Sequence, residues 1–161
     1  MLRFCQHPAR VIALGLCLLG CAALAPLRAL AQDQNQTETN EPPVFNEYKG
    51  VRLGMTTEEA RQKLGVPQEK SAVQDFYTFS DKETAQISYD AQHHVAAIAV
   101  FYLGTDKAPL SKTVLGADLA AKPDGSMYRL VRYPKVGCWV SYARTSGDAP
   151  LVTVMMQKYK P

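Results

Sequence analysis

The chain has 161 residues, of which 18 are Lys or Arg and 15 are Asp or Glu. Arg3, Arg10 and Arg28 lie in the first 31 residues, which hold no acid, so the remainder has 15 basic and 15 acidic residues and is formally neutral. In that remainder Lys and Arg are scattered among acids, which excludes the clustered positive surface that nucleic-acid binding requires.

The N-terminus is typical of an export signal. Arg3 and Arg10 precede an apolar run from Val11 to Ala25. Pro26 then leads to Ala29-Leu30-Ala31, in which the first and third residues are small. This order predicts a signal peptide over residues 1–31. The run is shorter than the roughly 20 residues that a membrane-spanning helix needs, which disfavours a retained membrane anchor.

A second processing site lies in the same segment. Leu18-Leu19-Gly20-Cys21 resembles a lipobox, in which Cys21 would be acylated and become the mature N-terminus, although Leu19 is larger than the usual residue there. We therefore expect a periplasmic or extracellular protein, anchored to the outer membrane only if Cys21 is lipidated. Of the 4 cysteines, Cys138 alone remains in the soluble mature form, where we expect a small buried hydrophobe and no intrachain disulfide.

Residues 32–43 are polar, lack hydrophobic periodicity and end in two prolines, which predicts a disordered linker. A single folded domain is expected over residues 44–161. Within it, Thr56-Thr57-Glu58-Glu59 predicts a capping box and a helix from Thr57 to Leu64, which Gly65 and Pro67 end. Glu58, Arg61, Gln62 and Lys63 are expected on the solvated side of this helix.

Strand signals dominate the rest of the chain. Segments rich in β-branched and aromatic residues are separated by turn signals, and we predict strands at Asp75–Phe79, Thr84–Tyr89, Val95–Tyr102, Ser126–Tyr133, Gly137–Arg144 and Pro150–Tyr159. The segment from Val95 to Tyr102 is apolar on both faces, which places it in the middle of the sheet. The fold class is therefore α+β, with short helices packed on one face of an antiparallel β-sheet.

The helix-and-strand pattern recurs along the chain. Leu53-Gly54 is followed by Leu64-Gly65, and later Leu103-Gly104 is followed by Leu115-Gly116, with strand signals after each second pair. This spacing favours two degenerate helix-plus-meander repeats, over residues 50–103 and 103–159, against coincidence among common residues. Pro109 restricts the second helix to a short one.

The segment from Val51 to Pro67 carries a recurring motif, in which the key residues are Gly54, Met55, Thr56, Leu64, Gly65 and Pro67. This motif resembles the SmpA/OmlA (BamE-like) outer-membrane assembly lipoproteins and the wider β-lactamase-inhibitor-protein-like fold. The resemblance covers about fifteen residues closely, and the strand pattern extends it to Leu103. It implies a structural role for the motif, and it implies either an envelope assembly protein or an inhibitor of a secreted hydrolase.

No constellation for catalysis is evident in the sequence. The only histidine cluster is His93-His94, whose side chains would point to opposite faces of a strand, with Asp90 as the one carboxylate nearby. Glu58 and Glu59 lie at a helix start, where they complement the helix dipole. We therefore expect no catalytic residues, no metal site and no cofactor.

Aromatic and arginine residues are concentrated in the predicted strands of the second half. Tyr and Trp are typical anchors of protein interfaces, so we predict a binding patch made of Tyr128, Arg129, Arg132, Tyr133, Trp139 and Tyr142. The alternative is that helices and loops cover these residues. The sequence thus predicts a non-enzymatic envelope binding module with a protein partner, and a membrane contact only through Cys21; a proteinaceous inhibitor of a secreted hydrolase is the alternative.

Overall fold

The computed structural model describes residues 35–159, so the predicted signal peptide and the predicted lipidation site at Cys21 lie outside the described residues. The elements follow one another as β1 (Gln36–Glu38), α1 (Thr57–Leu64), β2 (Glu69–Lys70), β3 (Gln74–Ser80), β4 (Glu83–Tyr89), β5 (Val95–Leu103), α2 (Ser111–Leu115), β6 (Met127–Tyr133), β7 (Cys138–Arg144) and β8 (Leu151–Lys158). The predicted helix has the observed bounds, and each predicted strand overlaps an observed one.

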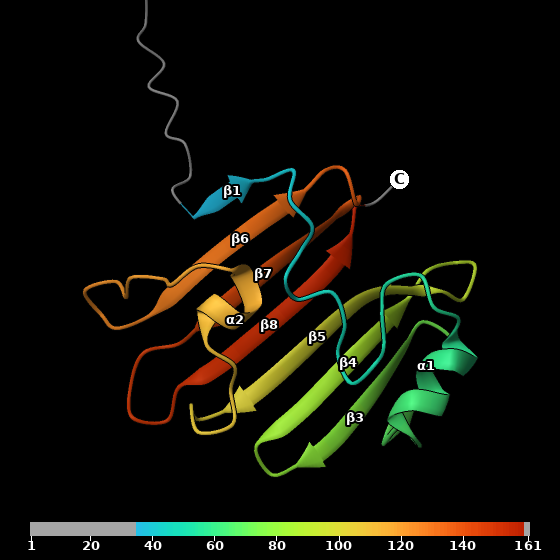
Figure 1. Cartoon of the computed structure of the whole chain (residues 1–161). Helices are drawn as coiled ribbons and strands as arrows, with labels where there is room; N and C mark the ends of the chain where they lie inside the picture. Colours follow the sequence, from blue (N-terminus) through green and yellow to red (C-terminus); the bar gives the residue numbers. More distant parts are fainter. Residues whose placement is uncertain (1–34, 160–161) are drawn as a thin grey trace, which may run out of the picture. The chain divides into compact units, whose positions relative to one another are not determined.

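All eight strands belong to one sheet, in the order β1-β6-β7-β8-β5-β4-β3-β2. Strands β3, β4 and β5 form one antiparallel meander, and β6, β7 and β8 form another. The two meanders join where β5 pairs with β8, at the centre of the sheet (Figure 1). Strand β1 runs parallel to β6, so the sheet is mixed and not purely antiparallel as predicted.

A single apolar core lies on one side of this sheet. Its centre consists of residues that are completely buried on adjacent strands, such as Ile87, Ile98 and Val154. Ala60 of α1 and Val114 of α2 belong to the same cluster. Both helices therefore cover the same face of the sheet (Figure 1).

Helix α1 forms where the sequence places its start and stop signals. The Thr56 hydroxyl accepts a hydrogen bond from the Glu59 N–H (3.2 Å), and the Glu59 carboxylate accepts one from the Thr56 N–H (2.8 Å), which completes a capping box. At the other end, Gly65 adopts a φ of +85°, and its N–H donates to the Arg61 carbonyl at 2.8 Å. Glycine populates this backbone region at little cost, and Pro67 prevents the helix from continuing.

Helix α2 is only five residues long. Leu110 precedes it without a side-chain capping bond, and Pro109 lies directly before that residue. The helix is retained by packing, because Val114 and Leu115 are 1% and 8% exposed. No helix within residues 35–159 is long and apolar enough to cross a membrane.

Two short edge strands were not predicted. Strand β1 falls inside residues 32–43, where the sequence predicts a disordered linker, and that prediction is wrong for Gln36–Glu38. The side chains of β1 are exposed, but the Leu130 N–H donates to the Asn35 carbonyl (2.8 Å) and the Thr39 N–H to the Arg132 carbonyl (3.0 Å). Pairing at a sheet edge uses backbone N–H and C=O groups and needs no apolar side chain, so a polar segment can form an edge strand. At the opposite edge β2 pairs with β3.

Candidate binding face and the cleft beside helix α1

The second face of the sheet is not part of the core. Its side chains come from the alternate residues of β3 to β8, which point away from α1 and α2. We call this surface the open face, and its residues on these strands are Gln74, Phe76, Thr78, Thr84, Gln86, Ser88, Ala97, Ala99, Phe101, Leu103, Tyr128, Leu130, Arg132, Trp139, Ser141, Ala143, Leu151, Thr153, Met155 and Gln157.

The strand register arranges the open face in continuous rows. In the central row Leu130, Ser141, Met155, Ala99, Gln86 and Phe76 lie opposite one another in turn, from β6 to β3. A second row runs from Arg132 through Trp139, Gln157 and Ala97. Small residues thus alternate with large ones, and Ala99 and Ser141 are each only 8% exposed between their larger neighbours.

Charge is almost absent from the open face. Among the outward-facing residues of the described strands β3 to β8, Arg132 alone is charged, and its guanidinium donates to the Gln36 side chain at 3.1 Å. On the short edge strands, exposed Glu38 of β1 lies opposite Arg132 and exposed Glu69 of β2 lies opposite Phe76, so the charges of this face lie toward its edges. The remainder is aromatic, aliphatic, hydroxylic or amide. Protein interfaces have charge-depleted centres enriched in aromatic residues and Met, so the composition of this face is that of an interface centre.

The six residues of the predicted aromatic and arginine patch do not form one surface. Tyr128, Arg132 and Trp139 lie on the open face, whereas Arg129, Tyr133 and Tyr142 point to the covered face. Tyr133 and Tyr142 are 3% and 4% exposed, and burial raises the pKa of both hydroxyls. Alternation along β6 and β7 divides the patch, because neighbours in sequence point to opposite sides of a strand.

The residues of the family-like motif have structural positions. Met55 and Leu64 are partly buried against the core, and Thr56 caps α1. Gly54 has a φ of +89°, and its N–H donates to the Val95 carbonyl at 2.8 Å, which ties the turn before α1 to the start of β5. No residue of the motif lies on the open face.

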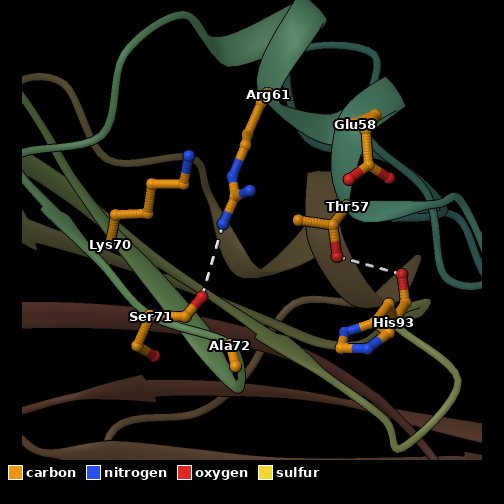
Figure 2. A pocket seen from close by; sticks show the side chains of 7 residues that line it. All are labelled: Thr57, Glu58, Arg61, Lys70, Ser71, Ala72 and His93. Carbon is orange, nitrogen blue, oxygen red and sulfur yellow. Dashed lines mark hydrogen bonds between the residues drawn. The ribbon is translucent and has the colours of Figure 1, made fainter.

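A cleft of about 470 Å³ lies between α1 and the segment joining β2 to β3 (Figure 2). It is lined by Thr57, Glu58, Arg61, Lys70, Ser71, Ala72 and His93. The Thr57 hydroxyl donates to the His93 carbonyl at 3.0 Å, so this side of the cleft ties α1 to the turn before β5. The neighbouring His94 faces Asp90 instead, with 3.8 Å between its Nδ1 and the carboxylate.

The cleft ends on a buried ion pair that the sequence does not reveal. Asp75 is completely buried, and Arg61 donates to both its carboxylate oxygens, at 2.7 and 2.9 Å. The Tyr89 hydroxyl donates at 2.7 Å, and Tyr77 lies at 3.5 Å. Arg61 also donates to the Ser71 carbonyl at 3.3 Å (Figure 2), so the prediction of a solvated Arg61 is wrong.

The electrostatics of this cluster indicate a structural role. Burial alone would raise the pKa of Asp75, but the hydrogen bonds from Arg61 and Tyr89 outweigh it and hold that pKa below its ordinary value. Burial and the adjacent carboxylate raise the pKa of Tyr77 to about 12. Asp75 thus stays ionised and Tyr77 protonated at neutral pH. The Nε and Nη2 donors of Arg61 are bound within the fold, although its side chain also lines the cleft.

No protein-family model, curated protein or solved structure matches this chain. The resemblance of the segment from Val51 to Pro67 to assembly lipoproteins therefore stays a prediction.

Proposed function

We propose that this protein is an exported, non-enzymatic binding module of the cell envelope that holds a protein partner on the open face of its sheet. The observation that carries the proposal is the near-absence of charge from that face, combined with the large side chains of Trp139, Met155 and Phe101. A solvated sheet face ordinarily carries polar and charged side chains in alternation with the buried ones. A face depleted of charge is suited to contact with another protein.

The open face predicts how the partner is recognised. Because the centre of the face carries no charge and Arg132, Glu38 and Glu69 lie toward its edges, most of the contact energy would come from burial of apolar surface and from hydrogen bonds. The hydrogen bonds would involve the amide and hydroxyl groups of Gln86, Ser141 and Thr153. Such binding depends weakly on ionic strength, in contrast to association steered by charged patches.

The proposal includes the relation between the halves of the chain. We propose that residues 50–103 and 103–159 are degenerate copies of one helix-plus-meander unit. This is supported by the order of elements, since each half has a short helix followed by a three-stranded antiparallel meander, and the first half adds only the two-residue strand β2. It is also supported by Gly65 and Gly116, which follow α1 and α2 in equivalent places. The resemblance at Val51 to Pro67 favours an assembly-type role for the module.

The experiment is crosslinking in the intact envelope of the source cell, followed by reconstitution. A photoreactive amino acid at Met155 would report the open face, and the same group at Glu58, an exposed residue of α1 on the covered side of the sheet, serves as the matched control. We expect one discrete protein adduct from Met155 and none from Glu58. An equal pattern from both positions would contradict the proposal.

Reconstitution then tests the interface itself. The captured protein, once purified, should bind with an affinity that falls at least tenfold in Trp139→Ala, the loss typical of an interface anchor, and changes little with added salt. If the captured protein is a hydrolase whose activity falls at stoichiometric amounts of this chain, the inhibitor class is the correct one. Unchanged affinity in Trp139→Ala would remove the open face as the binding site.

A further inference from the structure

A separate hollow of about 320 Å³ lies on the covered side of β6. Its walls are β6, the C-terminal end of α2 and the segment that follows β1, and it is lined by Thr37, Thr39, Glu41, Pro42, Val44, Leu115, Gly116, Ala117, Arg129, Val131 and Tyr133. Most of these side chains are apolar. The hollow lies on the opposite side of β6 from the open face.

Arg129 is the unusual member of this lining. The other four arginines of residues 35–159 each donate a hydrogen bond: Arg52 to Glu47, Arg61 to Asp75, Arg132 to Gln36 and Arg144 to the Gly125 carbonyl. Arg129 is partly buried, yet its guanidinium has no hydrogen-bond or ion-pair partner among the described residues. Its position beside an apolar hollow favours an anionic ligand, which would supply the partner that this cation lacks among the described residues.

The geometry defines the chemical class of that ligand. A guanidinium presents a planar pair of N–H donors that matches a carboxylate, whereas the walls formed by Val44, Leu115 and Val131 suit a hydrocarbon tail. At roughly 30 Å³ for each non-hydrogen atom, the hollow holds about ten such atoms, which is the size of an eight-carbon fatty acid. Glu41 is the single acid in the lining, and its side chain is exposed.

We propose that this hollow is a binding site for a medium-chain monocarboxylate, with the carboxylate on Arg129 and the tail between β6 and the C-terminal end of α2. The site does not depend on the proposed function of the open face. It includes Thr37 and Thr39 from the N-terminal segment, so β1 forms part of its wall.

The probe is octanoate, titrated into the purified protein and followed by NMR. We expect saturable shifts of the methyl resonances of Ala117 and Val131, with Ala143 on the open face unaffected. Octan-1-ol has the same tail without the charge and should bind at least tenfold more weakly. Equal affinity for octan-1-ol, or equal shifts at Ala143, would overturn the proposal.

Variants separate the role of Arg129 from that of net charge. Arg129→Gln should lose at least tenfold in octanoate affinity, the change expected when a charge-assisted hydrogen bond is removed. Lys112→Gln, which removes the same charge from an exposed position of α2, should bind as the parent does. Glu41→Gln should tighten binding. Arg129→Lys keeps the charge but lacks the planar pair of N–H donors, so its octanoate affinity should lie between those of the parent and Arg129→Gln. This variant provides the measurement if Arg129→Gln folds poorly. Wild-type affinity in both Arg129 variants would overturn the proposal.

Discussion

Replacing Arg61 by Met tests whether the cluster around Asp75 stabilises the fold. The Asp75 side chain is completely buried, and the Arg61 side chain is 22% exposed. Met fills part of the volume of the Arg61 stem but removes both hydrogen bonds from Arg61 to the carboxylate. The hydroxyls of Tyr89 and Tyr77 then remain as the side-chain donors to Asp75. Breaking a buried pair by removing one partner costs about 3–5 kcal/mol. Because the guanidinium borders a cleft that admits water, we expect the lower end, about 3 kcal/mol at neutral pH.

The loss should depend on pH in a defined direction. In the parent protein the folded pKa of Asp75 is lower than its unfolded value, so the stabilisation is fully present above the ordinary Asp pKa and is lost as the pH falls through the folded pKa. Without Arg61, burial dominates and raises the folded pKa of Asp75, so the variant loses stability as the pH rises through about 4. The difference in unfolding free energy between the two proteins should therefore shrink from neutral pH toward roughly pH 3.

The assay is urea unfolding at the two pH values, followed by the fluorescence of Trp139, the single tryptophan. Arg52→Met is the matched control, since it removes the same side chain from the pair with Glu47, whose members are 62% and 41% exposed. An exposed pair contributes about 0–1 kcal/mol, so this control should change little. If Arg61→Met cost no more than Arg52→Met, or cost the same at both pH values, the structural role of the cluster would be refuted.

Two further predictions concern the N-terminal cap of α1 and the buried thiol of Cys138. Thr56→Ala removes the capping-box hydroxyl of α1 and should lower the unfolding free energy by about 1 kcal/mol, measured by urea unfolding against Thr113→Ala, an exposed threonine of α2, as a control that changes it little. Cys138 is 1% exposed, and burial raises the pKa of its thiol, so its reaction with a thiol reagent in native conditions should follow the rate of unfolding; rapid labelling of the native protein would contradict this burial.

The local signals in the sequence predicted local structure well. The capping box at Thr56 and the Gly65-Pro67 ending fix the two ends of α1 through interactions between residues close in sequence. The bounds of the helix can therefore be predicted from the sequence alone. The run from Val95 to Tyr102 is apolar on both faces, which predicts a place in the middle of the sheet, and β5 lies there, between β4 and β8.

The site could be predicted less well, because it depends on pairing between distant segments. Arg61 and Asp75 are separated by fourteen positions and come from a helix and a strand, so each looks like a solvated residue in isolation. The predicted patch grouped residues by proximity in sequence, although period-2 alternation already separates Arg129 from Tyr128. The open face is recognisable only when the register aligns Phe76, Ala99 and Met155, which lie on β3, β5 and β8.

Strand β1 provides the sharpest contrast between sequence and structure, because a disordered linker and an edge strand predict different exchange at β6. If β1 is paired, the Leu130 amide, which donates to the Asn35 carbonyl at 2.8 Å, is protected from hydrogen exchange. Thr39→Pro removes the N–H that donates to the Arg132 carbonyl and should release β1, so protection at Leu130 should fall although Leu130 itself is unchanged. Thr39→Ala keeps that N–H and should retain the protection. Free exchange of Leu130 in the parent protein would show that residues 36–38 belong to the linker, and it would also remove one wall of the hollow beside Arg129, since Thr37 and Thr39 line it.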